Sequence, residues 1–307
     1  MIKDRMNQPR LLLIVADDFG IGPATSRGIL ELAAQRRLTG TVFLVNSPFA
    51  EQAVADWRSA GMPLDLGWHP CLTLDRPILP ADRVPSLVDS EGRFPTLGRW
   101  LRGLALGRFR AEHVEAEFRA QLARFTELVG HAPLFVNAHH HLQIFPMIGR
   151  VLRTILGELP MRPYLRRVRE PMATLFRVGG ARGKRLFLNT LGRLQARVQN
   201  AEKFPGNDML AGLSDPVAAR ENRFFTQWIR KSPGDVVELM CHPGHLDETL
   251  LGRDGTWEDG LIQRRAWEYR LLADPSFPEI VRSAGFQLAS PESLTVGGAV
   301  WTRRLAS

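Results

Sequence analysis

Apolar runs of strand length alternate with helical patterns along most of this chain, and this alternation restricts the fold more than any other feature. Strands are indicated at residues 11–18, 40–47, 64–74, 133–141, 234–245 and 286–290. Helices are indicated from Pro23 onward and at residues 49–61, 111–130, 146–160 and 264–274. Strands that alternate with helices form a parallel sheet or barrel, so the sequence predicts an α/β fold.

Two long segments interrupt the alternation. Residues 75–107 contain several prolines and glycines without a clear period, and an excursion of this length often carries function. Residues 174–204 are basic, have helical apolar spacing and contain no acid before Glu202. Because no internal repeat or low-complexity linker is present, we expect one domain over residues 1–307, with residues 174–204 as a helical lid insertion.

The charge of the chain leaves several kinds of partner open. Its 40 Lys and Arg exceed its 32 Asp and Glu, giving a formal net charge of +8. Such a charge suits nucleic acid, anionic lipid or phosphate, or only an arginine-rich surface. Nothing resembles a nucleic-acid motif, so no nucleic-acid partner is expected. No apolar run is long enough to span a membrane and the N-terminus lacks a signal-peptide core, so we expect a cytoplasmic location, including the inner face of the membrane.

Acids and histidines gather at four of the predicted strand ends: Asp17 and Asp18, His69, His139–His141, and His242. In parallel α/β architectures the carboxyl ends of the strands share one face, so these side chains can converge. A carboxylate with two imidazoles is a known ligand set for a catalytic divalent metal. Each group alone has a plainer interpretation as a helix cap, core histidine, surface cluster or turn. Their joint occurrence favours a metal site.

Other polar residues near these strand ends have plainer expected roles. Cys71 and Cys241 lack a CxxC spacing and are expected to be free, buried thiols rather than nucleophiles. Asp247, Arg265 and Glu268 are expected to be polar residues on a helix surface rather than catalytic groups.

Six segments carry a resemblance to a known family. "LLIVADDFGIGPATSRGI", "TVFLVNSP", "DLGWHPCLTLDRPILP", "LVDSEGRF", "FVNAHHHLQIFP" and "VELMCHPG" occur in order and resemble the YdjC-like carbohydrate deacetylases over nearly the whole chain. "RPILP", "LVDSEGRF" and "VNAH" are most similar to the hopanoid-biosynthesis-associated (HpnK-like) branch. The resemblance implies a TIM-like, distorted (β/α) barrel that removes the N-acetyl group from an amino sugar. The branch implies an N-acetylglucosaminyl glycolipid of hopanoid biosynthesis as the substrate.

The same resemblance implies roles for the strand-end residues. Asp17 matches the catalytic base, and Asp18, His69 and His139 match the metal ligands. His242 of "CHPG" matches the general acid that protonates the leaving amine. The expected cofactor is one divalent metal ion, zinc in the first place and magnesium as an alternative.

Three further residues are placed near this group by the resemblance or by sequence adjacency. Arg166 of "LRRVREP" resembles an arginine near the substrate. His140 and His141 are expected to orient the ligands, to bind sugar hydroxyls, or only to pack. The chain has Gln143 where family members often have another histidine, a departure that bears on substrate preference.

Several functions stay open at this point. The alternatives are a deacetylase of soluble chito-oligosaccharides, a metal-dependent phosphoesterase or lyase, and a non-enzymatic basic membrane-associated protein. The adjacent aspartates with a separate strand-end histidine favour amide hydrolysis. Residues 174–204 either pack on the barrel with their arginines in water or form a lid that meets an anionic bilayer. The oligomeric state is left open.

Overall fold

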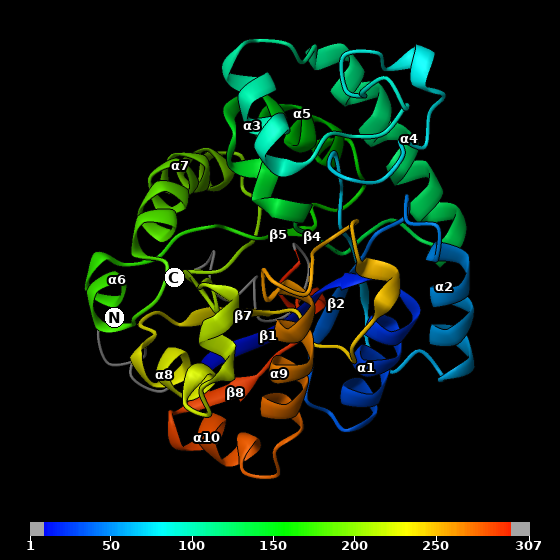
Figure 1. The fold of residues 1–307 in the computed structure, drawn as a ribbon. Helices are drawn as coiled ribbons and strands as arrows, with labels where there is room; N and C mark the ends of the chain where they lie inside the picture. The colour runs from blue at the N-terminus through cyan, green and yellow to red at the C-terminus, as the bar shows by residue number, and fades with distance from the viewer. Residues whose placement is uncertain (1–8, 296–307) are drawn as a thin grey trace.

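The computed structural model describes residues 9–295, which form a curled parallel sheet surrounded by helices (Figure 1). Residues 1–8 and 296–307 of the predicted domain lie outside the described residues. The strands are β1 (Arg10–Phe19), β2 (Gly40–Phe43), β3 (Leu66–Trp68), β4 (Phe135–Val136), β5 (Tyr164–Leu165), β6 (Met209–Ala211), β7 (Val236–Cys241) and β8 (Phe286–Leu288). They pair in the order β5-β4-β3-β2-β1-β7-β6, with β8 beside the start of β1, and every pairing is parallel. The predicted α/β class and distorted barrel are confirmed.

The barrel is distorted because its two edge strands, β5 and β6, do not pair as strands. Irregular backbone hydrogen bonds join the edges instead: the amide of Leu165 donates to the carbonyl of Pro205 at 2.8 Å, and the amide of Leu210 donates to that of Arg169 at 2.9 Å. The sheet therefore closes without a regular ladder at this seam.

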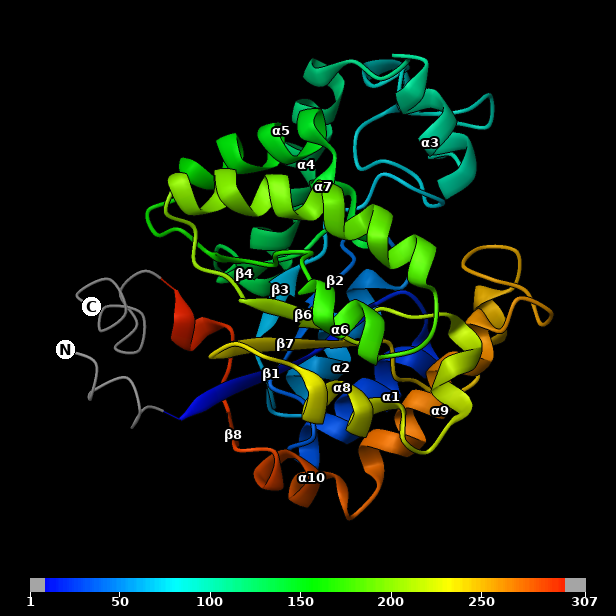
Figure 2. The ribbon, with the colours of Figure 1, turned by 90° about the vertical axis from the view of Figure 1, so that its left-hand side faces the viewer.

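Helices cover the outside of the sheet (Figures 1 and 2). They are α1 (Pro23–Ala34), α2 (Ala50–Ser59), α3 (Leu97–Ala105), α4 (Ala111–Val129), α5 (Pro146–Gly157), α6 (Met172–Arg177), α7 (Arg182–Ala201), α8 (Phe224–Lys231), α9 (Leu261–Ala273) and α10 (Phe277–Ser283). Pro23 and Pro146 occupy first turns, where a missing N–H costs no hydrogen bond, and Gly130 ends α4 at φ 97°. The five predicted helices α1, α2, α4, α5 and α9 are confirmed, and residues 174–204 are largely helical.

Strand β1 runs through the centre of the sheet and separates two apolar clusters. Leu11, Leu13 and Val15 belong to the cluster that also contains Phe135 of β4 and Tyr164 of β5, inside the barrel. The alternate residues of β1 pack against the surrounding helices. This division follows from the period of two along a strand.

The sequence pattern missed five elements: α3 within the 75–107 excursion, and β5, β6, α8 and α10. Strands β5 and β6 have only two and three residues, too few to show a period, and the three helices are short, with nine, eight and seven residues. Among the described residues, no helix combines the length and apolar character needed to cross a bilayer.

Candidate active site

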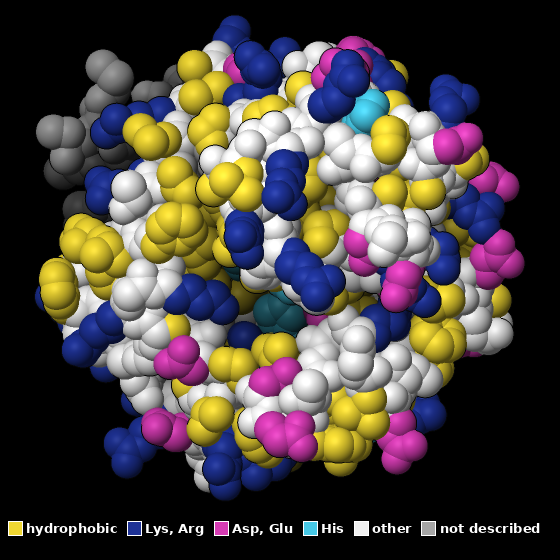
Figure 3. Space-filling view, turned by 45° about the horizontal axis from the view of Figure 1, so that its top comes forward, with side chains coloured by type: hydrophobic (Ala, Val, Ile, Leu, Met, Phe, Trp, Pro, Cys, Tyr) yellow, Lys and Arg dark blue, Asp and Glu magenta, His cyan; other side chains and the backbone are white. Residues whose placement is uncertain are grey.

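A cavity of about 310 Å³ opens at the carboxyl ends of the strands. The strand-end residues predicted from the sequence all line it: Asp17, Asp18, His69, His139, His140, His141 and His242. In the space-filling view a histidine is visible at the bottom of a hollow, with Lys and Arg side chains around its rim (Figure 3). Strand ends that are far apart in the sequence thus meet in one place.

The two adjacent aspartates enter this cavity because the backbone changes conformation between them. Asp17 continues the inward-facing set of Leu13 and Val15. Asp18 would then face the outside of the barrel, but its φ of 68° lies in the left-handed region and turns its side chain into the same cavity. Both carboxylates are 2% exposed, so neither is a surface acid.

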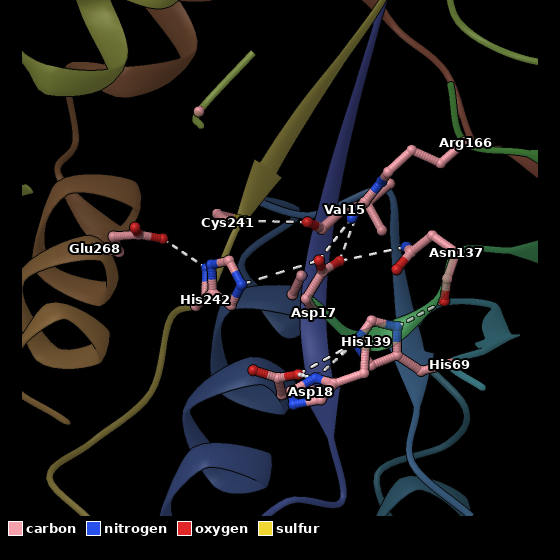
Figure 4. Close-up of polar contacts among 12 residues, drawn as sticks. Val15, Asp17, Asp18, His69, Asn137, His139, Arg166, Cys241, His242 and Glu268 are labelled. Atoms are coloured by element: carbon pink, nitrogen blue, oxygen red, sulfur yellow. Dashed lines mark hydrogen bonds and ion pairs between the residues drawn. The ribbon is translucent and has the colours of Figure 1, made fainter. Parts of the chain in front are cut away.

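Asp18, His69 and His139 form a compact triangle (Figure 4). The Asp18 Oδ1 atom lies 2.9 Å from His139 Nδ1 and 3.2 Å from His69 Nε2, and the two ring nitrogens are 3.3 Å apart. For bonds of the length usual in zinc sites, the edge of a coordination tetrahedron is about 3.3 Å. These three atoms therefore have the spacing of three metal ligands.

The protonation of His69 supports the same assignment. Its Nδ1 lies 2.7 Å from the backbone carbonyl oxygen of Asn137, which can only accept a hydrogen bond. In the neutral ring the proton is then on Nδ1, and the lone pair of Nε2 faces the Asp18 carboxylate. Two acceptors face each other in a buried place, an arrangement that a bound cation makes favourable. The donor set thus fits a divalent metal.

Charges around Asp18 keep it ionised. Burial alone raises the pKa of its carboxyl group, but Arg265 and the neighbouring His139 hold that pKa well below its usual range. Burial lowers the pKa of His139, and the Asp18 carboxylate more than reverses this and raises it. The carboxylate is therefore available as an anionic ligand at neutral pH.

Asp17 is held from behind by Arg166. The guanidinium donates two hydrogen bonds, from Nη1 to Asp17 Oδ2 at 2.6 Å and from Nη2 to Oδ1 at 2.7 Å. Its Nε donates to Glu238 at 2.5 Å, and Asn137 Nδ2 donates to Asp17 at 3.3 Å. Arg166 has no exposed surface and does not line the cavity. The arginine that resembles one near the substrate thus contacts Asp17 directly.

His242 lies on the other side of Asp17 from Arg166 (Figure 4). Its Nε2 is 3.9 Å from Asp17 Oδ2, and its backbone amide donates to Glu268 at 2.5 Å. Burial, with a contribution from Arg264, moves the pKa of His242 well below its usual value. The ring is therefore neutral at pH 7, with a nitrogen toward Asp17.

The sequence pattern predicted that the histidine triplet ends a strand, but the structure places it after the strand. Strand β4 ends at Val136, and the triplet begins a 3-10 turn, η3 (His139–Ile144). His140 and His141 have φ of 53° and 58°, a strained conformation for residues with a Cβ atom. His140 Nδ1 is within 2.9 Å of the Thr73 hydroxyl, and burial lowers the pKa of both rings well below the usual value.

The prediction that Asp247, Arg265 and Glu268 lie on a helix surface is wrong. All three are buried, with 3%, 3% and 0% exposure. Asp247 accepts hydrogen bonds from the first turn of α1, from the amides of Ala24 and Thr25 at 2.8 and 3.2 Å. Arg265 and Glu268 contact the site because α9 packs beside it. Their spacing of three places them on one face of the helix, but the sequence does not show that this face is turned toward the site.

The cysteines are buried free thiols, as expected. Burial, with the nearby Asp75 carboxylate, raises the pKa of Cys71 to about 12, and burial raises that of Cys241 well above its usual value. Neither forms a thiolate at neutral pH, so neither acts as a nucleophile.

Helices α3 and α7 supply apolar walls to the cavity. Leu97 and Leu101 come from α3, and Phe187 and Leu188 come from α7 together with Lys184. The part of the cavity wall that these side chains form is therefore suited to an apolar group. This wall includes part of the predicted 174–204 insertion.

Known proteins resemble this chain over most of its length. The family model described as YdjC-like protein matches residues 11–283. A carbohydrate deacetylase of Geobacillus stearothermophilus is 30% identical, covering 91% of this chain and 96% of the relative. A chitooligosaccharide deacetylase of Yersinia pestis is 25% identical, covering 92% and 98%. A solved structure from Enterococcus faecalis, described as that of a candidate cellobiose-phosphate cleavage protein, is 26% identical with a TM-score of 0.76, covering 94% and 100%.

Proposed function

This chain belongs to the YdjC-like protein family, and we propose that it is a metal-dependent N-deacetylase of an amino sugar carried on a glycolipid. Relatives named carbohydrate deacetylase and chitooligosaccharide deacetylase support the enzyme class, a hydrolase acting on amides. One observation carries the proposal for this chain. A three-atom ligand set, a second aspartate and an imidazole share one buried cavity.

Amide hydrolysis needs an activated water, stabilisation of the developing oxyanion and a proton for the leaving amine. Asp18, His69 and His139 are the residues proposed to hold the metal. A divalent ion there, zinc in the first place and magnesium as the alternative, would supply Lewis-acid activation of water and of the acetyl carbonyl. Phosphoesterases and lyases use similar ligands, but the separate Asp17–His242 pair fits the proton transfers of amide cleavage.

Asp17 is proposed to accept the proton of the attacking water. Arg166 fixes both of its oxygens, so the carboxylate keeps one orientation during turnover. The 3.9 Å between Asp17 and His242 allows the same proton to pass to the neutral imidazole. His242 would then give it to the departing nitrogen, which agrees with a ring that is neutral before the reaction.

His140 and His141 line the cavity beside the proposed ligands. His141 Nδ1 is buried and has no hydrogen-bond partner among the described residues. A sugar hydroxyl is a suitable partner for it. We infer that His141 contacts the sugar, while His140 holds the turn in place through its hydrogen bond to the Thr73 hydroxyl.

The apolar walls support a glycolipid substrate, an N-acetylglucosaminyl lipid such as that of hopanoid biosynthesis. The sugar would lie over Asp18, His69 and His139, and the attached lipid would extend out of the cavity between α3 and α7. Apolar side chains continue outward on α6 and α7: Phe176, Leu186, Phe187 and Leu194 are 66%, 47%, 52% and 51% exposed. Soluble chito-oligosaccharides are the second candidate, favoured by the relatives named for that activity.

The same surface supports peripheral contact with the inner face of the membrane through the proposed 174–204 lid. Exposed cations on α7 accompany its apolar residues: Arg182, Lys184, Arg193 and Arg197. Anionic headgroups attract such a surface while its apolar side chains enter the interface. A lipid-linked sugar would then be reached without leaving the bilayer.

Acetate release tests the proposed activity. The full-length protein, stripped of metal and then supplied with zinc, should release acetate from an N-acetylglucosaminyl glycolipid only when metal is present. Soluble N-acetylated chito-oligosaccharide is the parallel substrate, and faster turnover of it would replace the glycolipid proposal with the second candidate. No acetate from either, with metal bound, would contradict the deacetylase.

Vesicle sedimentation tests the membrane contact separately. Binding to anionic vesicles at low salt is expected, and Phe176→Ser should weaken it. Met62→Ser is a matched control, because Met62 is 57% exposed but lies outside the lid. Equal binding by the two variants, or none by the unmodified protein, would refute the contact.

A further inference from the structure

Arg265 joins the proposed metal ligand Asp18 to a second acid. Its Nη2 donates to Asp18 Oδ2 at 2.8 Å and to Asp254 Oδ2 at 2.7 Å. Its side chain is 3% exposed, and its Nε and Nη1 atoms have no hydrogen-bond partner among the described residues. The two carboxylates are therefore the anchors of the guanidinium.

Asp254 belongs to the loop between η5 (Glu248–Leu250) and α9, and its neighbour fixes that loop to the rest of the cavity wall. Arg253 donates to both oxygens of Asp75, at 2.6 and 2.8 Å. A carboxylate oxygen of Asp254 also lies within 4.8 Å of ring nitrogens of His139 and His140. Asp254 is thus held at the edge of the metal triangle without belonging to it.

The two oxygens of Asp18 have different partners. Oδ1 faces the ring nitrogens of His69 and His139, and Oδ2 faces Arg265. A carboxylate can rotate about its last bond and present either or both oxygens to a metal. The guanidinium occupies one oxygen and leaves the other for the ion.

We propose that Arg265 and Asp254 are positioning residues that orient Asp18 as a one-oxygen ligand of the metal. The inference rests on the proposed metal site. Both residues would act through Asp18 and not through a contact with the substrate. Partners of this kind that hold a metal ligand are worth about 10- to 100-fold in metal affinity.

Two effects of Arg265 on a metal have opposite signs, which makes the proposal testable. Its positive charge repels a cation, so if charge alone mattered, removal of Arg265 would tighten binding. If orientation of Asp18 matters more, removal weakens binding because the freed carboxylate must be ordered again when the metal binds.

Calorimetric titration of the metal-stripped, full-length protein with zinc measures this directly. For Arg265→Met we expect a dissociation constant raised about 10- to 100-fold. Arg265→Lys should recover part of the affinity, and Asp254→Asn should weaken binding in the same direction. Arg270→Met, on an exposed part of the same helix, is the matched control and should bind as the unmodified protein does.

Unchanged or tighter zinc binding by a folded Arg265→Met protein would overturn the proposal. If that variant does not fold, Asp254→Asn decides, and unchanged affinity in it overturns the proposal equally. Absence of zinc binding by the unmodified protein would instead contradict the metal site itself, so the two failures are distinguishable. If a variant with both Arg265→Met and Asp254→Asn binds zinc more weakly than Arg265→Met alone, the two residues do not act as a unit.

Discussion

Replacement of Asp17 by Asn separates the chemistry of this residue from its role in the buried ion network. Asn keeps the size of Asp and can accept one hydrogen bond from Arg166 through its oxygen. Its amide nitrogen must then face the other N–H group of the guanidinium, so one of the two bonds at 2.6 and 2.7 Å is lost. The side chain also loses the capacity to accept a proton at neutral pH.

The magnitudes follow from these losses. A hydrogen bond to a charged group is worth about 1.5–3 kcal/mol, so the free energy of unfolding should fall by about that amount. Glu238 still balances Arg166, so the larger cost of an unpaired buried charge is avoided and the protein should fold. Loss of a general base should lower kcat by about 10²–10⁴-fold.

The assay measures kcat for acetate release, metal content and urea unfolding in one preparation. Glu170→Gln is the matched control, because Glu170 accepts two hydrogen bonds from a buried arginine, Arg185, outside the candidate site cavity. That variant should lose at least as much stability, because Arg185 has no second acidic partner among the described residues, but it should keep its turnover. The base assignment is refuted if Asp17→Asn retains metal and turns over within a few-fold of the unmodified enzyme. It also fails if Glu170→Gln loses as much rate.

Three further changes test other parts of the site and fold. His69→Ala should lose most of the bound zinc measured by atomic absorption, whereas full occupancy would exclude this residue as a ligand. His242→Ala should slow amide cleavage about 100-fold or more but spare acetyl esters with good leaving groups, since these need no protonation; equal losses on both would contradict the acid role. Burial and the neighbouring Glu292 raise the pKa of Asp65 to about 6. A raised carboxyl pKa favours the native state at low pH, and this stability is lost as pH rises from about 4 to 6. Asp65→Asn should therefore stabilise the protein by about 1–2 kcal/mol at pH 7.5 but not at pH 4, and a gain independent of pH in urea unfolding would refute this.

The sequence predicted most of the sheet because its longest strand has an unambiguous pattern. Residues 11–16 are continuously apolar, as expected for a strand covered on both faces, and the acids that follow mark its carboxyl end. The convergence of four strand ends then follows from parallel topology alone. Nothing in the residue pattern predicts the left-handed φ of Asp18, which depends on packing around the site.

The residues around α9 were assigned incorrectly because charged residues are usually exposed. Arg265 and Glu268 are buried only because each has a partner on a distant element, Asp18 on β1 and the amide of His242 after β7. Such pairing depends on which helix lies beside the cavity, and a single sequence does not specify this. The spacing of the apolar residues in α9 predicted a helix, but it did not indicate which side of that helix faces the cavity.

The left-handed backbone at Asp18, His140 and His141 also has an evolutionary consequence. A residue with a Cβ atom costs about 1–2 kcal/mol in this conformation, and glycine avoids most of that cost. Selection for stability and selection for activity therefore oppose each other at these three positions. In a lineage that no longer needed the reaction, glycine or asparagine would be favoured there. Such substitutions, appearing while the rest of the barrel is retained, would mark a descendant that keeps this fold but has lost its catalysis.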